Sequence, residues 1–324
     1  MSGEGTRRGE FELIAALFQP LSKGAPGALG LTDDAALIDV SPGHQLVTTV
    51  DTLIAGVHFR ADDPPELIAR KALRVNLSDL AAKGARPVGF LHALALNTDT
   101  SDSFLERYAQ GLGADVREFA VPLLGGDTTS GPGPLAITIT AFGEVKAGTM
   151  LLRSGAKPGD VLCVTGTIGD GALGLACLNG ALTRSDVLIE RYHLPRPRFK
   201  AGQALVGFAT ACLDISDGLV ADVGHIAETS HIGVVIERDK IPLSADARAA
   251  VAQDPETWDL VLGGGDDYEL AFSVPASRAG ELPALAEQLG LALTPIGTIV
   301  AGEGVTVTVQ GKSVALTRRG YTHR

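Results

Sequence analysis

The sequence has few cysteines and no long apolar run, and each absence excludes a class of protein. Cys163, Cys177 and Cys212 are the only cysteines in 324 residues and form no close pair. Neither a disulfide framework nor a zinc-ligand spacing is therefore indicated, and we expect three small core residues in a reducing cytosol. No segment approaches eighteen unbroken apolar residues, and the N-terminal stretch carries Glu10 and Glu12 without a small-residue cleavage site. These features predict a soluble, cytoplasmic protein.

Basic residues are also in deficit. Lys and Arg total 27 against 38 Asp and Glu, which gives a net charge of −11, and no basic run offsets it. An acidic surface repels phosphate backbones and anionic lipids, so we expect neither a nucleic-acid partner nor a membrane partner.

The length is sufficient for two ordinary domains, and segments of period 2 alternate with helical ones, which predicts a mixed α/β architecture. In the first half we expect strands at residues 44–50, 89–96, 121–124 and 135–145, and helices at 64–84 and 103–119. The pattern restarts after residue 148, with an apolar strand at 161–166, helices at 172–178 and from 201, and a strand pair near 296–309. The predicted domains are residues 1–148 and 149–324.

Aspartates recur just after predicted strands or at glycine-rich turns, which is where open α/β folds build their sites. Each one alone could instead be a turn former or a helix N-cap. Asp51 directly follows the strand predicted at residues 44–50, and Asp127 is the last residue of the segment LLGGD. The set comprises Asp33, Asp34, Asp51, Asp127, Asp214, Asp217, Asp266 and Asp267.

Asp79 differs from these because it falls within the apolar stripe of the helix predicted at 64–84. We expect its carboxylate to point toward the core side, which is costly unless it is paired or bound to a metal. A structural alternative is an i,i+4 ion pair with Lys83 at the helix surface.

Convergence of several carboxylates would create a repulsion of roughly 3 kcal/mol per pair at about 5 Å, which bound cations would relieve. Oxygen ligands without a His or Cys cluster favour Mg²⁺ over zinc. Glycine-rich turns beside the acids can bring backbone N–H groups close to phosphate oxygens. The sequence contains no GxxxxGK[ST] motif, so a P-loop does not hold the phosphates.

One glycine motif is open to two interpretations. Gly169, Gly171 and Gly174 satisfy GxGxxG after the strand VLCVTG. A dinucleotide site would need a parallel βαβ unit that is hard to trace afterwards. The structural alternative is a tight strand-to-helix turn.

Ten segments match one family in order. They are GEFELI, DDAAL, TTVDTLIAGVHF, KALRVNLSDLAAKGA, GGDTTSGP, RSGAKPGD, TGTIGDGALGL, DISDGL, GGGDDYELAF and GYTHR, and they span nearly the whole chain. On these motifs the chain resembles the thiamine-monophosphate kinase family. The resemblance implies a two-domain aminoimidazole ribonucleotide synthetase-like fold whose N-terminal sheet forms the interface of a homodimer. It also implies a phosphotransferase with a phosphate group as acceptor, converting thiamine monophosphate and ATP to thiamine diphosphate and ADP.

The resemblance further assigns residues by motif. Several Mg²⁺ ions would be bound by Asp33, Asp34, Thr49, Val50, Asp51, Asp79, Asp127, Asp214 and Asp217. ATP would be contacted by Gly126, Asp127, Arg153 and Ser216, and thiamine monophosphate by His58, Asp266 and Tyr321. Asp127, Arg153 and Asp217 would be the catalytic residues. The resemblance leaves open whether K⁺ is required.

The chain departs from the family pattern at three positions. Val50 stands where relatives usually have Thr, so a metal contact there would come from its backbone carbonyl. Asp266 stands where relatives often have Glu, which shortens its reach by one methylene. Lys83 replaces a common Met and alters the charge near Asp79.

Two side chains and the overall activity have alternatives. His58 could be a satisfied loop histidine, and Tyr321 could pack on the core rather than cover a thiazolium ring. The acceptor phosphate is mostly dianionic at neutral pH because its second pKa is about 6, so the reaction needs no general base. The rival activities are another ATP-using enzyme of the same superfamily and a non-catalytic nucleotide-binding protein.

Overall fold

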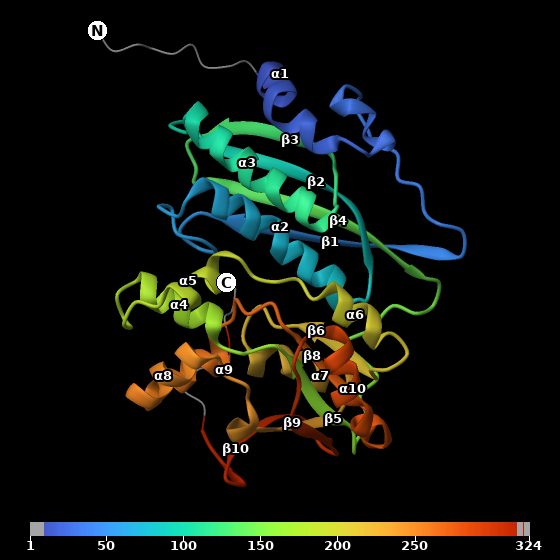
Figure 1. Cartoon of the computed structure of the whole chain (residues 1–324), viewed down its shortest axis with the longest axis vertical. Coiled ribbons are helices and arrows are strands. Elements are labelled where there is room, and N and C mark those ends of the chain that lie inside the picture. Colours follow the sequence, from blue (N-terminus) through green and yellow to red (C-terminus); the bar gives the residue numbers. More distant parts are fainter. Residues whose placement is uncertain (1–9, 316–319, 321–324) are drawn as a thin grey trace. The chain divides into compact units, whose positions relative to one another are not determined.

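The computed structural model describes residues 10–315 and Gly320, and the chain folds into two compact units. In the described part, unit 1 comprises residues 10–80 and 87–144, and unit 2 comprises residues 81–86, 145–315 and Gly320. Figure 1 shows the chain coloured along the sequence.

Unit 1 contains a four-stranded sheet in the order β1-β4-β2-β3. The strands are β1 (His44–Ile54), β2 (Arg86–Asn97), β3 (Leu123–Gly131) and β4 (Ala136–Lys146). Buried and half-buried residues alternate along most of β4, as the period-2 sequence pattern predicted. β2 and β3 run parallel, which places the segment LLGGD directly beside β2.

Two long helices, α2 (Pro65–Ala82) and α3 (Asp102–Phe119), lie over this sheet (Figure 1). Pro65 begins α2, where its missing N–H costs no hydrogen bond. Ser101 caps α3 by accepting the backbone N–H of Phe104. In unit 1 the two helices are joined by a buried ion pair, in which Arg74 Nε donates to Asp115 Oδ2 over 2.6 Å.

An N-terminal helical segment precedes β1. It comprises α1 (Glu10–Leu13), a π-helical turn (Ile14–Phe18) and two 3₁₀ segments (Gln19–Ser22 and Pro26–Leu31). Phe18, Leu21 and Ala28 are buried. This segment leads the chain directly to Asp33 and Asp34.

Unit 2 contains a seven-stranded sheet in the order β11-β10-β7-β9-β5-β8-β6. The central strand β5 (Val161–Thr165) pairs antiparallel with β8 (Leu270–Val274) and β9 (Leu293–Val300). The remaining strands are β6 (Ala211–Asp214), β7 (Gly233–Glu237), β10 (Gly304–Val309) and β11 (Lys312–Ser313). Because β6 pairs antiparallel with β8, the loop that follows β6 lies beside the loop that precedes β8.

Seven α-helices accompany this sheet in the described part of unit 2. They are α4 (Asp170–Leu178), α5 (Asp186–His193), α6 (Phe199–Leu205), α7 (Leu219–Ser230), α8 (Ala245–Gln253), α9 (Trp258–Gly263) and α10 (Leu282–Leu289). Short 3₁₀ turns occur at Arg238–Lys240, Pro255–Thr257 and Ala276–Glu281. α4 packs against α5, and both contribute side chains to an apolar core with β5 and α7.

Several sequence predictions need correction. Asp51 and Asp127 lie inside β1 and β3 rather than at strand ends, because hydrogen bonding to neighbouring strands continues past both residues. The strand predicted at 121–124 begins later and runs to Gly131. The strands near 296–309 are not paired with each other, since β7 lies between β9 and β10.

All three cysteines are buried free thiols, as the sequence predicted. Burial raises the pKa of Cys163 and of Cys212 to about 12. Within the residues that the structure describes, every helix is too short or too polar to span a bilayer.

Candidate functional site

A cavity of about 700 Å³ in unit 1 brings together four of the predicted site residues. Asp33, Asp34, Gly126 and Asp127 all contribute to its wall, and the three acids are exposed. The backbone N–H of Asp34 donates to Asp33 Oδ1 over 2.8 Å, which orders the turn between these two acids. The other lining residues are mostly apolar or threonine, and they include Phe18, Leu31, Ile38, Phe142 and Thr138.

Gly126 is required by the backbone that forms this wall. In the parallel register, His92 lies opposite Gly126 and Ala93 lies opposite Asp127. A Cβ at position 126 would overlap the carbonyl oxygen of His92. The glycine therefore allows β3 to approach β2 closely and fixes where the Asp127 carboxylate leaves the sheet.

A buried polar pair lies next to this strand. His92 Nε2 and the Tyr108 hydroxyl are 2.8 Å apart, and both residues are almost fully buried. Burial lowers the pKa of His92 to about 4 and raises the pKa of Tyr108. His92 is therefore neutral at pH 7, and the wall beneath Asp127 carries no positive charge from it.

A second group of predicted residues lies where β1 faces α2. The Thr49 hydroxyl donates to Asp79 Oδ2 over 2.5 Å, and the Asp51 N–H donates to Asn76 Oδ1 over 3.0 Å. Asn76 is fully buried and also donates to the Ala72 carbonyl. Asn76 escaped the sequence analysis, although it stands in the same NLSDL motif as Asp79.

The predicted alternative for Asp79 was an ion pair with Lys83. The Asp79 carboxylate is half-buried and has the Thr49 hydroxyl as a partner. In unit 2, the Lys83 ammonium donates to the Cys212 carbonyl over 3.2 Å. The Val50 side chain is 58% exposed. A metal contact through its backbone carbonyl stays a prediction.

His58 lies in the loop that follows β1. Its Nδ1 accepts the backbone N–H of Ile54 over 3.0 Å, so the neutral ring carries its proton on Nε2. This bond satisfies one ring nitrogen locally, as the loop-histidine alternative supposed.

In unit 2, the loop after β6 contains Ser216 and Asp217. A single buried carboxylate oxygen, Asp222 Oδ2, accepts the backbone N–H groups of Ser216, Asp217 and Gly218 over 3.0, 2.9 and 3.1 Å. Burial raises the pKa of Asp222 to about 7, while the bonded amides act in the opposite direction. Asp222 thus holds the backbone of Ser216, the predicted ATP contact, and of Asp217, a predicted Mg²⁺ ligand. Asp214, another predicted Mg²⁺ ligand, lies buried at the end of β6.

Asp222 was missed by the sequence analysis. The available signal was an acid four residues after Gly218, in the first turn of the following helix, where carboxylates often accept free backbone N–H groups.

The loop before β8 lies against the loop that contains Ser216. The Asp266 N–H donates to the Ser216 carbonyl over 2.9 Å, and the Tyr268 N–H donates to the Ile215 carbonyl over 2.8 Å. Asp266 and Tyr268 are half-buried, whereas Asp267 and Glu269 are buried, so successive side chains of DDYE alternate outward and inward.

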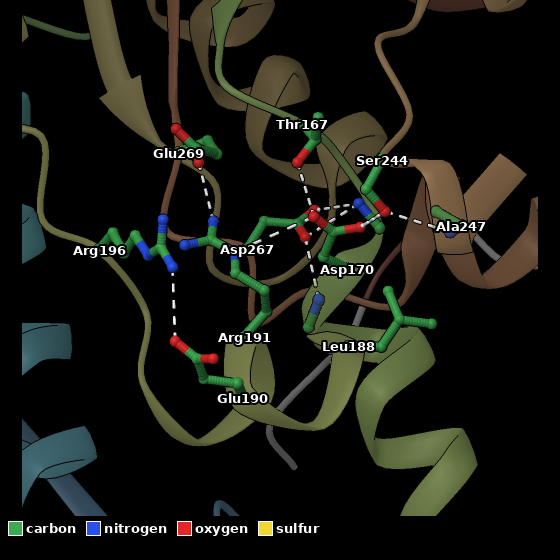
Figure 2. A network of polar contacts seen from close by, with 12 residues as sticks. Thr167, Asp170, Leu188, Glu190, Arg191, Arg196, Ser244, Ala247, Asp267 and Glu269 are labelled. Carbon is green, nitrogen blue, oxygen red and sulfur yellow. Dashed lines mark hydrogen bonds and ion pairs between the residues drawn. The ribbon is translucent and has the colours of Figure 1, made fainter. Parts of the chain in front are cut away.

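The inward acids belong to the network in Figure 2. Glu269 accepts hydrogen bonds from Arg191, Arg198 and Thr165, and Asp267 accepts backbone N–H groups from the first turn of α4. Asp170 accepts from Thr167 and Ser244, each over 2.6 Å.

The GxGxxG motif follows the predicted structural alternative. Gly169 is the N-cap of α4, and a Cβ at Gly171 would overlap the Asp266 carbonyl oxygen. The motif is a tight strand-to-helix turn whose glycines allow close packing.

Two predicted residues remain. Arg153 is exposed in the segment before β5. Tyr321 lies outside the described residues.

Within unit 1, the predicted metal ligands lie in two places, on the cavity wall and between β1 and α2. In the part of the chain that the structure describes, no three His, Cys, Asp or Glu side chains are placed to hold a metal ion. Mg²⁺ is usually held by one or two carboxylates together with waters and phosphate oxygens, and it prefers oxygen donors. The exposed acids Asp33, Asp34 and Asp127 on one cavity wall fit this mode of binding.

Comparisons with known proteins cover nearly the whole chain. Residues 32–145 match the family model of the AIR synthase related protein, N-terminal domain, and residues 157–310 match that of its C-terminal domain. A thiamine-monophosphate kinase of Caulobacter vibrioides is 42% identical over 318 residues, which are 97% of this chain and 90% of the relative.

Two solved structures share the fold along most of the chain. The crystal structure of thiamine-monophosphate kinase from Stenotrophomonas maltophilia K279a has a TM-score of 0.82 and 40% identity, covering 94% of this chain and 96% of that one. AaThiL complexed with AMPPCP and TMP has a TM-score of 0.77 and 32% identity, covering 99% of this chain and 100% of that one.

Proposed function

The chain belongs to the thiamine-monophosphate kinase family of AIR synthase related proteins, and we propose that it transfers the γ-phosphoryl group of ATP to thiamine monophosphate, giving thiamine diphosphate and ADP. A relative that shares the fold over nearly its whole length was solved with AMPPCP and TMP, which supports both substrates.

One observation of this chain carries the proposal. Gly126 and Asp127 on β3 and the pair Asp33 and Asp34 line the same cavity. A backbone without a Cβ beside three carboxylates can accept phosphate groups once cations offset the charge. We assign ATP contacts to Gly126, Asp127, Arg153 and Ser216.

Several Mg²⁺ ions would supply charge neutralisation and orientation of the phosphates. The residues that would hold them are Asp33, Asp34, Thr49, the Val50 carbonyl, Asp51, Asp79, Asp127, Asp214 and Asp217. The carboxylate of Asp79 is oriented by Thr49, and the loop of Asp217 is held by Asp222. A requirement for K⁺ is decided by the same assay, run with and without the ion.

The protein's own task in the reaction is positioning. The acceptor phosphate is dianionic near neutral pH, so no side chain needs to remove a proton. His58 contacts the acceptor and does not act as a base. Asp127, Arg153 and Asp217 are the catalytic residues, and the exposed Arg153 guanidinium offsets charge that develops on the transferred group. Asp266 and Tyr321 contact thiamine monophosphate.

We further propose that residues 1–148 bind ATP and Mg²⁺ and form a homodimer through their sheet, and that residues 149–324 complete the active site. β1 is an edge strand that exposes Leu46 and Val50, which supports an interface along this edge. The proposed location is the cytoplasm.

The test is direct. Purified protein is incubated with ATP, MgCl₂ and thiamine monophosphate, and the products are separated by chromatography. Formation of thiamine diphosphate and ADP in equal amounts is expected. ATP consumption without thiamine diphosphate would favour a sibling enzyme of the superfamily, and ATP binding without turnover on any acceptor would favour a nucleotide-binding protein.

A further inference from the structure

The motif GGGDDYEL contains three acids, and the fold sorts them into two kinds. Asp267 and Glu269 are 2% and 0% exposed, whereas Asp266 and Tyr268 keep part of their surface accessible. Only Asp266 among the three acids can therefore meet a substrate without unfolding the loop.

Asp267 attaches this loop to the first turn of α4. Its Oδ1 and Oδ2 each lie 2.9 Å from the Gly169 amide nitrogen, and Oδ1 lies 3.3 Å from the Gly171 amide nitrogen. Gly171 in turn packs directly against the Asp266 carbonyl, where a Cβ would not fit. The first turn of α4 thus contacts the loop both through the Asp267 carboxylate and through the Asp266 backbone.

The attachment opposes a cost in the backbone. Asp266 and Tyr268, which flank Asp267, have φ angles of 64° and 51°. Residues with a Cβ rarely adopt this left-handed backbone conformation. A residue with a Cβ is strained in this conformation and keeps it only where its surroundings hold it. Asp267 provides such a constraint midway between the two left-handed residues.

We propose that Asp267 is a positioning residue, which by gripping the Gly169–Gly171 turn holds Asp266 in the left-handed conformation that presents its carboxylate to thiamine monophosphate. Glu269 supports the same loop from its next inward position, through Arg191 and Arg198. The inference rests on the proposed function, because it takes thiamine monophosphate as the ligand of Asp266.

The principal variant is Asp267→Asn, which keeps the size of the side chain but turns an N–H₂ group toward the Gly169 N–H. The matched control is Asp160→Asn, in the same unit. Asp160 is also buried, and its Oδ2 accepts the Lys157 N–H over 2.9 Å and the Thr210 hydroxyl over 2.7 Å.

Asp267→Asn is expected to raise the KM for thiamine monophosphate by about tenfold or more, because small displacements of a positioned group reduce its effect strongly. The KM for ATP should not change, and Asp160→Asn should leave both KM values at the wild-type level. In the Asp266→Ala background, Asp267→Asn should raise the KM for thiamine monophosphate no further, since coupled residues are not additive. Equal increases in both KM values, or additive effects of the two substitutions, would overturn the proposal.

Hydrogen exchange separates this inference from the proposed function. Asp267→Asn should accelerate amide exchange in residues 265–269 and 169–171, and Asp160→Asn should not. If the wild-type protein forms no thiamine diphosphate, the proposed function fails, and unchanged exchange in Asp267→Asn would reject the positioning role as well. If Asp267→Asn does not fold, Asp267→Glu replaces it. This variant keeps the charge but pushes the loop outward by one methylene, and an unchanged KM for thiamine monophosphate would reject the role.

Discussion

The hydroxyl of Thr49 on β1 donates to the Asp79 carboxylate on α2 over 2.5 Å, which joins two residues thirty positions apart in the sequence. Both were predicted to bind Mg²⁺ from separate motifs. The hydrogen bond leaves the second carboxylate oxygen of Asp79 with a fixed direction.

Removing this hydroxyl should lower the affinity for Mg²⁺ while leaving the stability of the fold largely unchanged. Thr49→Val is expected to raise the Mg²⁺ concentration for half-maximal activity by about tenfold, because groups that orient a metal ligand typically change affinity by 10- to 100-fold. The measurement is activity against MgCl₂ at saturating ATP. Thr48→Val, at the exposed neighbouring position on the same strand, is the control and should match the wild type. Equal Mg²⁺ dependence in both variants would remove Thr49 from this role.

Asp127 should matter to turnover and not to stability. Asp127→Asn keeps the shape of an exposed side chain, so the melting temperature should stay at the wild-type value while kcat falls by about 100-fold or more. Asp99→Asn, at another exposed aspartate of unit 1, should change neither quantity. Wild-type turnover in Asp127→Asn would exclude this carboxylate from the reaction.

Replacing Asp222 by Ala should reduce stability and activity more than replacing it by Asn. Asp222→Ala leaves the N–H groups of Ser216, Asp217 and Gly218 without their acceptor, and an unsatisfied buried group costs about 1–3 kcal/mol. We expect a lower melting temperature and a large loss of kcat/KM for ATP. Asn retains one oxygen in place of Oδ2, so Asp222→Asn should keep most of both. Comparable losses in the two variants would indicate that charge, rather than hydrogen bonding, holds the loop.

Stability should depend on pH through His92. Its pKa is about 4 when folded and 6.5 when unfolded, so below pH 6.5 the unfolded state binds more protons and stability falls as the pH falls. The loss should reach about 3 kcal/mol near pH 4 and then level off. Hydrogen exchange of β2 at several pH values measures it, and His92→Gln should show a flatter dependence between pH 6.5 and 4. An identical slope in this variant would assign the pH dependence to other groups.

Gly126 offers a steric test of the cavity wall. Gly126→Ala should separate β3 from β2, because its Cβ would overlap the His92 carbonyl, and both stability and turnover should fall. Gly133→Ala is matched to it, since a Cβ there meets no atom within 4 Å. If both variants keep wild-type activity and melting temperature, β3 tolerates a side chain at this point.

The strands and helices of unit 1 were largely predictable because their sequence periods are long and regular. β4 shows an alternating burial pattern over most of its length, and α2 begins at a proline. Unit 2 was harder to predict. β6 and β8 are fully buried strands of four and five residues, and such short apolar runs show no period that separates them from helix.

The residues of the candidate site were also predictable only in part. The acid-rich motifs could be found in the sequence, because Asp beside Gly is conspicuous. Which acid of DDYE faces outward depends on the left-handed backbone at Asp266 and Tyr268, and no sequence period encodes that. Asn76 escaped because its side chain accepts the backbone N–H of Asp51, 25 residues away, a contact that only the folded chain creates.

The burial of the thiols has a practical consequence. At neutral pH a thiol with a pKa of about 12 is almost entirely protonated, and the thiolate is the form that oxidants and alkylating reagents attack. Cys163 and Cys212 are fully enclosed as well. Peroxide or iodoacetamide should therefore leave these two residues unmodified in the native protein, so their labelling reports directly on unfolding.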